Sequence, residues 1–201
     1  MALFGFGAKN PDDQQEDIEP AALGRRDFLR FGFGAAVAGA LMTPEDALAA
    51  VRAPSRMVHL HNLHTGEQAR AEYWVKGQYV RSSLRLINRV LRDHRSGDVH
   101  PMDPRLLDQI YLLTRAVAKR GPVEIISAYR SPESNAMLRE EDGSGVAQNS
   151  YHMQGRAVDI RVPGMPLRQL RAAALRLKAG GVGFYPRSNF VHIDTGPVRH
   201  W

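Results

Sequence analysis

The chain has 201 residues, of which 43% are hydrophobic and 24% charged, a composition that is ordinary for a folded globular protein and excludes a wholly disordered chain. The absence of cysteine excludes disulfides, thiolate metal sites and a cysteine nucleophile, so any metal must be bound by nitrogen and oxygen ligands. The formal net charge is +6, and residues 50–201 hold 23 basic and 13 acidic residues. This excess suggests an acidic partner, although a generic solvated surface explains charge alone better, and no nucleic-acid-binding motif accompanies it.

The chain begins with a segment whose composition predicts an export signal. Residues 1–24 show no sustained apolar period and are expected to be disordered. Arg25 and Arg26 then precede an apolar run over residues 31–42, a pattern that resembles a twin-arginine signal and implies the twin-arginine export machinery as a partner. The run is shorter than the about 20 residues of a membrane-spanning helix, so no stable transmembrane anchor is expected.

A cleavage motif, Ala47-Leu-Ala49, ends this segment and predicts a boundary between residues 1–49 and a domain over residues 50–201. Two alternatives stay open. The signal is either left uncleaved as an anchor, or the segment is a buried amphipathic helix that follows a chance pair of arginines.

The first half of the domain predicts a hairpin and two helices. β-Prone runs at Arg56–Leu63 and Gln68–Val75 flank a short turn. Apolar residues at helical spacing predict a helix over Ser83–Arg95. Asp103-Pro104 is a start signal for a second helix, which the Gly121-Pro122 pair stops.

Val123–Ser127 is predicted to be a strand that leads into a loop containing Arg130. Functional side chains often lie where a rigid strand hands over to a loop. The planar guanidinium of Arg130 could bind a substrate carboxylate or polarise a carbonyl through its fixed set of donors. A surface salt bridge explains this arginine equally well.

Two further segments provide a candidate metal site. His152 lies in a turn that Gly155 breaks, and Asp159 follows in a β-prone run. In the run Phe190–Asp194, His192 and Asp194 point to the same face because strand side chains alternate. Two imidazoles and a carboxylate are a usual ligand set for catalytic zinc. Each of these residues taken alone could equally be an ordinary polar side chain.

Pro166 opens a further helix that ends at Ala179-Gly180-Gly181, and two short strands around residues 186–189 form a second hairpin. Trp201 either walls the metal site or fills the core. The mixture of strands and helices without a regular βαβ rhythm predicts an α+β domain with a small antiparallel sheet packed against helices.

The motifs together resemble the zinc D-alanyl-D-alanine peptidase and hedgehog-like metallopeptidase superfamily (peptidase family M15), and most closely its murein endopeptidase K-like branch. The resemblance covers residues 56–201. It rests on the pattern Ser150-x-His152-x-x-Gly155-x-Ala157-x-Asp159, on His192, and on further segments: Ser127-Ala-Tyr-Arg130-Ser-Pro, His61-Asn-Leu-His-Thr-Gly66-Glu67, Arg92–Pro104 and Val191–Arg199.

The resemblance implies that His152, Asp159 and His192 bind zinc, that Arg130 orients the substrate, and that the domain cleaves peptide cross-links of peptidoglycan in the periplasm. In related branches an acidic residue stands three positions before the last histidine, where this chain has Asn189, which cannot accept the proton. Asp194 is therefore expected to act as the general base or to orient an imidazole, with Glu133 and His200 as weaker candidates for the base.

Two hypotheses of different classes follow. The first is an exported zinc metallopeptidase that remodels the cell wall. The alternative is a non-catalytic module in which zinc stabilises a cell-wall-binding domain, as a missing base would permit. A fourth protein ligand would favour the second hypothesis, because structural zinc sites usually close with four.

Overall fold

The computed structural model describes residues 43–116, 121–141 and 146–201. The disordered start and the twin-arginine pair predicted for residues 1–42 lie outside these ranges and stay predictions. Over the described part of the chain, no helix has the length and apolar character needed to cross a membrane.

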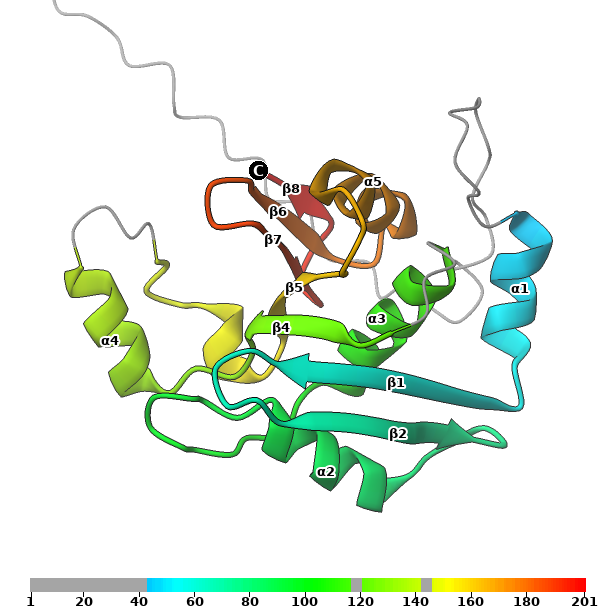
Figure 1. Ribbon diagram of the computed structural model, residues 1–201, viewed down its shortest axis with the longest axis horizontal. Coiled ribbons are helices and arrows are strands. Elements are labelled where there is room, and N and C mark those ends of the chain that lie inside the picture. Colours follow the sequence, from blue (N-terminus) through cyan, green and yellow to red (C-terminus); the bar gives the residue numbers. More distant parts are fainter. Residues whose placement is uncertain (1–42, 117–120, 142–145) are drawn as a thin grey trace, which may run out of the picture. The chain divides into compact units, whose positions relative to one another are not determined.

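Strands and helices are mixed along the described chain without strict alternation (Figure 1). The elements are α1 (Pro44–Arg52), β1 (Ser55–Asn62), β2 (Gln68–Val75), β3 (Gln78–Tyr79), α2 (Arg81–Val90), α3 (Pro104–Ala116), β4 (Val123–Ser127), α4 (Pro132–Glu140), the 3-10 helix η2 (Tyr151–Gln154), β5 (Ala157–Arg161), α5 (Leu167–Leu177), β6 (Gly181–Tyr185), β7 (Phe190–Asp194) and β8 (Arg199–His200).

One eight-stranded sheet, in the order β3-β2-β1-β4-β5-β7-β6-β8, organises the described residues. Both predicted hairpins are confirmed, because β1 pairs with β2 and β6 pairs with β7 in antiparallel register. Two other pairs are parallel: Leu60 of β1 lies opposite Val123 of β4, and Val182 of β6 lies opposite His200 of β8.

The α+β class is confirmed, but the sheet is mixed and larger than the small antiparallel sheet that was expected. Parallel strands need a long crossover connection, and the crossover from β1 to β4 contains β2, β3, α2 and α3 rather than a single helix. The order of predicted strands and helices along the sequence therefore does not indicate that β1 and β4 are parallel. β8 consists of two exposed residues, which are too few to carry a periodic signal.

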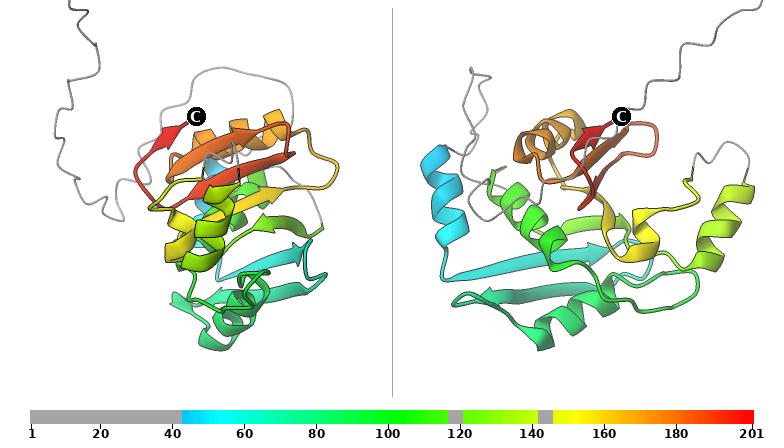
Figure 2. Two further views of the ribbon diagram at one scale, coloured as in Figure 1. Left: turned by 90° about the vertical axis from the view of Figure 1, so that its left-hand side faces the viewer. Right: turned by 180° about the vertical axis from the view of Figure 1, so that it is seen from behind.

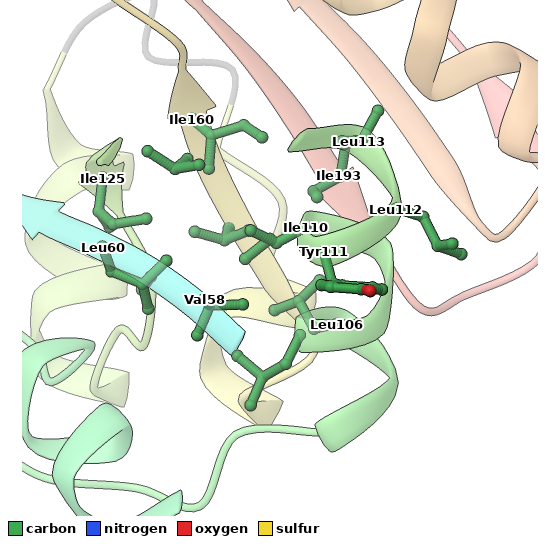
Figure 3. Close-up of a cluster of buried hydrophobic side chains, with 14 of the residues drawn as sticks. Val58, Leu60, Leu106, Ile110, Tyr111, Leu112, Leu113, Ile125, Ile160 and Ile193 are labelled. Carbon is green, nitrogen blue, oxygen red and sulfur yellow. The ribbon is translucent and has the colours of Figure 1, made fainter. Parts of the chain in front are cut away.

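The core lies between α3 and one face of the sheet (Figure 3). Seen from behind in Figure 2, α3 covers this face of the central strands. Strand alternation supplies the sheet side of the core and helical spacing supplies the α3 side, as predicted. Among the residues that meet there are Val58, Leu60, Leu106, Ile110, Leu113, Ile125, Ile160 and Ile193.

The same alternation places polar residues on the opposite face of the central strands. Ile160 of β5 and Ile193 of β7 belong to the core cluster. Asp159 and His192 are their neighbours along the strands, and they are paired across β5 and β7. Because successive side chains point to opposite faces, the candidate metal ligands lie on the side of the sheet away from the core.

Two helices differ from the sequence predictions. α2 ends at Val90 rather than Arg95, because Asp93 closes a turn in which its carboxylate accepts from Arg95 N at 2.9 Å. The second difference is α4, for which the sequence analysis predicts no helix. It begins at a cap, with Ser131 Oγ accepting from Ser134 N at 3.1 Å and proline in the first turn, rather than with an apolar stripe.

The predicted cleavage motif falls inside α1. Ala50 is 1% exposed and belongs to the core cluster, and α1 packs against α3. Cleavage after Ala49 would therefore divide this helix as it stands in the folded chain. Cleavage itself remains a prediction.

The turn that follows His152 can be tested by substitution of Gly155, the predicted conformational break. It has a φ of 65°, and a Cβ there would lie 2.4 Å from Pro101 O. We expect Gly155→Ala to lower the free energy of unfolding by about 2–4 kcal/mol, since backbone strain and a clash add. The measurement is urea denaturation.

Gly66→Ala is the matched control, because Gly66 has a φ of 71° and nothing within 4 Å of an added Cβ. It should lose only the strain, about 1 kcal/mol. Equal losses in the two variants would contradict the account of the close approach at Gly155.

Candidate metal centre

Three elements bring the predicted ligands together. Asp159 and His192 are directly opposed on the antiparallel strands β5 and β7. His152 comes from η2, whose first turn is capped by Ser150 Oγ accepting from His152 N at 3.3 Å. All three side chains are buried, so the site is held by the fold rather than by a mobile surface.

The three side chains converge on one point. His192 Nδ1 lies 2.9 Å from Asp159 Oδ1 and 3.2 Å from His152 Nε2. His152 Nε2 lies 3.4 Å from the same carboxylate oxygen. One potential ligand atom from each residue lies within 4.8 Å of the others, and in the described ranges no other group of three or more His, Cys, Asp or Glu residues meets this condition.

The outer nitrogen of each imidazole has a partner that can only accept a hydrogen bond. His152 Nδ1 donates to the carbonyl oxygen of Ala128 at 2.7 Å, and His192 Nε2 donates to Asp194 Oδ2 at 3.1 Å. In the neutral rings, the inner nitrogens therefore carry lone pairs that face Asp159 Oδ1. This arrangement is typical of imidazoles that bind metals.

This donor set fits a cation. Three lone-pair atoms in mutual contact repel one another unless a positive charge lies between them. Burial on its own lowers the pKa of His192, but hydrogen bonds and charges from Asp159 and Asp194 raise it to about 9. Burial on its own would raise the pKa of Asp159. The charges and hydrogen bonds of the two histidines outweigh this effect and hold the pKa of Asp159 well below its usual range. A proton meets the demand for positive charge, and a divalent cation held by nitrogen and oxygen would meet it too.

Asp194 faces the opposite side of His192 from the converging ligands. It is fully buried, and Arg199 Nη2 and Gly196 N each donate to it at 2.8 Å, with a further bond of 3.0 Å from Gly181 N. Burial raises its pKa, and these bonds together with the one from His192 outweigh that effect and lower it. The carboxylate is thus fully occupied in fixing the ring of His192.

Arg130 is not a surface ion pair. It is 9% exposed, and its backbone N donates to His152 O at 3.2 Å, which ties its loop to η2. Nη1 donates to Asn135 Oδ1 at 3.2 Å, whereas the buried Nε has no hydrogen-bond partner. Burial, opposed by the charge of Asp159, lowers the pKa of this guanidinium. A buried donor without a partner is costly, so an anionic ligand would relieve it.

The loop that contains Arg130 is anchored by Asp93, a residue that sequence reasoning missed. Asp93 is 1% exposed, and its Oδ2 accepts from Ser131 N at 2.8 Å. No periodic pattern marks a single buried carboxylate. The signal that the sequence does offer is the place of Asp93 in the segment Arg92–Pro104, which carries part of the family resemblance.

An aromatic wall stands beside His192. The ring of Trp201 lies 5.3 Å from that of His192, and Trp201 Nε1 donates to Tyr185 Oη at 2.7 Å. A Cβ on Gly183 would lie 2.8 Å from the indole of Trp201, so the indole can pack at this position only because residue 183 is glycine. Trp201 is 46% exposed, so it walls the site and does not fill the core.

The remaining candidates for a general base lie on the surface. Glu133 is exposed in the first turn of α4, and His200 is exposed in β8. Asn189 has a φ of 55° in the turn between β6 and β7, a left-handed conformation that asparagine tolerates better than most residues. Turn geometry therefore explains the asparagine at this position.

Comparison with known proteins shows extended similarity. A family model described as "Peptidoglycan L,D-endopeptidase MepK" matches residues 50–201. The proteins named "Peptidoglycan L,D-endopeptidase MepK" in Escherichia coli K12 and in Shigella flexneri are each 46% identical over 178 residues, covering 88% of this chain and 96% of theirs. A "Probable peptidoglycan L,D-endopeptidase MepK" of Haemophilus influenzae is 40% identical over 179 residues, covering 88% and 95%.

Asp93 supports a prediction about acid stability. Burial alone would raise its pKa, but hydrogen bonds from Ser134, Ser131 and Arg95 lower it from 3.8 to about 2. A lowered pKa stabilises the folded state above pH 3.8, and this contribution is lost as the pH falls through about 2. We expect Asp93→Asn to cost about 2 kcal/mol of unfolding free energy at pH 7.

The difference between the wild type and Asp93→Asn should narrow below pH 3.8 in urea titrations. Asp98→Asn is the control, because Asp98 is exposed and bonds only to Ser96, two residues away, through its side chain. A difference that stays constant from pH 7 to pH 3 would contradict the anchoring role of the Asp93 carboxylate.

Proposed function

The chain belongs to the family of the peptidoglycan L,D-endopeptidase MepK, and from this membership we propose that it is a zinc-dependent endopeptidase that hydrolyses peptide cross-links of peptidoglycan. The observation that carries the proposal is the buried convergence of His152, Asp159 and His192 beside a buried arginine with an unpaired donor. The bond cleaved is the one that the relatives' names give, between an L-configured and a D-configured centre.

Zinc is the metal that suits this donor set best. Two imidazoles and one carboxylate are a usual catalytic zinc site, and the chain has no thiolate to offer. When bound, zinc supplies a Lewis acid that acidifies water and polarises a carbonyl group. His152 Nε2, His192 Nδ1 and one oxygen of Asp159 would hold it.

The number of donors supports an enzyme rather than a module that only binds cell wall. In the described residues, no fourth His, Cys, Asp or Glu belongs to the group. Three protein donors leave one position of a tetrahedral site free for water or substrate, whereas a structural zinc site usually closes with four.

Arg130 is proposed to orient the substrate. Peptide stems of peptidoglycan carry free carboxylates, and the guanidinium provides a planar set of donors, of which the buried Nε is unpaired. Because its backbone is bonded to His152 O, the guanidinium and the metal ligands keep a fixed relation. A carboxylate held there would place the neighbouring peptide bond near the metal site.

Asp194 is proposed to act through His192 and not as the general base. Its oxygens are used by His192 Nε2, Arg199 and two backbone N–H groups, and it lies on the far side of the ring from Asp159. A carboxylate in this position fixes the tautomer of a ligating imidazole and raises its basicity.

We also propose export by the twin-arginine pathway and action in the periplasm. The Arg25-Arg26 pair and the following apolar run support this route. The similarity to the relatives covers 88% of the chain, whereas residues 50–201 make up about three quarters of it, so the similarity extends into the signal-like segment. Peptidoglycan lies outside the cytoplasmic membrane, so an enzyme acting on it requires export.

The proposed reaction is tested by incubating the zinc-loaded full chain with purified muropeptide dimers. One set of dimers is joined by an L,D bond and the other by a D,D bond. Chromatography with mass spectrometry should show that the L,D dimer is split into two monomers with the uptake of one water molecule. An intact L,D dimer after prolonged incubation with bound zinc would overturn the proposal.

Substitution of a metal ligand and substitution of Asp194 should have different effects on zinc binding and on cleavage. His152→Ala removes a ligand, so calorimetry should show loss of zinc binding and the cleavage assay loss of activity. Asp194→Asn should keep the fold of the site but weaken zinc affinity or turnover by about 10- to 100-fold, because the imidazole loses the negative charge of its acceptor. Full zinc affinity together with full turnover in Asp194→Asn would refute the orienting role.

Replacement of Arg130 tests substrate orientation. Arg130→Lys keeps the charge but loses the planar fork, so we expect kcat/KM on the soluble L,D dimer to fall by about 10- to 100-fold while zinc affinity is unchanged. Arg168→Lys, an exposed arginine on α5, is the control. The same kcat/KM for Arg130→Lys and the wild type would rule out a carboxylate contact at this residue.

A further inference from the structure

One face of α2 is lined with arginines. Arg81, Arg85 and Arg89 are each exposed and follow one another at a spacing of four residues, which aligns them along the helix. We call these three residues the arginine stripe. Ile87 and Val90 on the opposite side of the helix are buried, so the stripe faces away from the sheet.

In the described structure no acidic side chain lies within ion-pair distance of the stripe, although Glu67 interacts with Arg89 at longer range. The helix Arg81–Val90 contains no Asp or Glu, and none of the three arginines forms an ion pair with a described residue. Glu67 forms its ion pair with Arg92, and its pKa is lowered mainly by that bond and to a smaller extent by the charge of Arg89. Like charges at a spacing of four destabilise a helix, so the stripe lowers the intrinsic stability of α2. A role in binding a ligand would explain why three arginines are aligned there.

The C-terminal end of α2 lies beside the loop that contains Arg130. The residues that follow α2 are hydrogen-bonded to this loop, since Tyr129 N donates to Leu91 O at 3.0 Å and Ser131 N donates to Asp93 Oδ2 at 2.8 Å. Exposed Arg95 continues the positive charge between the helix and this loop. With a rise of about 1.5 Å per residue, the stripe extends about 12 Å along α2.

We propose that the arginine stripe is a docking surface for peptidoglycan, where it binds free carboxylates of peptide stems that lie outside the bond being cleaved. This inference rests on the proposed function. Charge complementarity selects the occupant, because the polymer that reaches Arg130 carries further carboxylates on its neighbouring stems. The stripe would hold the polymer while the metal centre acts on one cross-link, which raises the effective concentration of nearby bonds.

A membrane surface fits the stripe less well. Helices that lie in a bilayer interface bury a broad apolar face, whereas α2 turns its apolar face toward the sheet. Leu86, which is 47% exposed, is the large hydrophobic residue that α2 presents to solvent. One exposed leucine beside three arginines is suited to an anionic polymer in water.

The test compares two doubly substituted full-length proteins of equal charge. Arg85→Gln with Arg89→Gln removes two charges from the stripe, and Arg168→Gln with Arg176→Gln removes two exposed arginines from α5. Each protein is measured for binding to insoluble peptidoglycan sacculi by sedimentation at low salt, and for kcat/KM on the soluble L,D dimer. Thermal unfolding checks that all proteins are folded.

The stripe variant should bind sacculi about 5- to 10-fold more weakly than the wild type, in line with the loss of two exposed ion contacts. Its kcat/KM on the soluble dimer should stay within about twofold of the wild type, because the proposal assigns to the stripe only stems that lie outside the cross-link being cleaved. The α5 variant should match the wild type in both assays. At 1 M salt the difference should vanish, since exposed charges are then screened within about 3 Å.

Three results would overturn the proposal. The first is unchanged binding of sacculi by the stripe variant, and the second is an equal loss in the α5 variant, which would show a general effect of charge. The third is weaker binding to anionic lipid vesicles with sacculus binding intact, which would assign the stripe to a membrane. If the wild type cleaves no dimer, the proposed reaction fails separately, because sedimentation measures binding without cleavage.

Discussion

The structure depends on one electrostatic constraint: three lone-pair donors meet in a buried place and require a positive charge between them. The outer nitrogens of His152 and His192 are committed to Ala128 O and Asp194, so the rings cannot turn away from Asp159. Burying this group costs free energy unless it is neutralised. The group lies on the face of the sheet away from the core, where the pairing of β5 with β7 fixes Asp159 and His192.

The mixed sheet explains how distant segments reach this place. Pairing of β5 with β7 sets Asp159 opposite His192, and β4 next to β5 carries the chain into the loops that hold Ala128 and Arg130. β8 and Trp201 then close the other side of His192. Each group that would touch substrate is therefore attached to a strand end or to a turn that the sheet fixes.

Much of this arrangement could be predicted from the sequence. Alternation in the run Phe190–Asp194 was enough to put His192 and Asp194 on one face, and the hydrogen bond between them confirms it. Whether Asp194 faces the metal or stands behind the ring depends on which nitrogen it contacts, and no one-dimensional pattern contains that information. The parallel pairing of β1 with β4 could not be predicted either, because the connection between the two strands is long and irregular. Asp93 was missed for the same reason, since its partner Ser131 lies 38 residues away.

The proposed zinc ion would be held by His152, Asp159 and His192, with one coordination position left open. The most direct measurement is a crystal structure of the zinc-loaded protein with anomalous difference density recorded at the zinc edge. We expect a peak at about 2.0–2.2 Å from His152 Nε2, His192 Nδ1 and an oxygen of Asp159, with a fourth ligand that is not protein. A peak elsewhere, or a fourth protein side chain on the metal, would contradict the proposal.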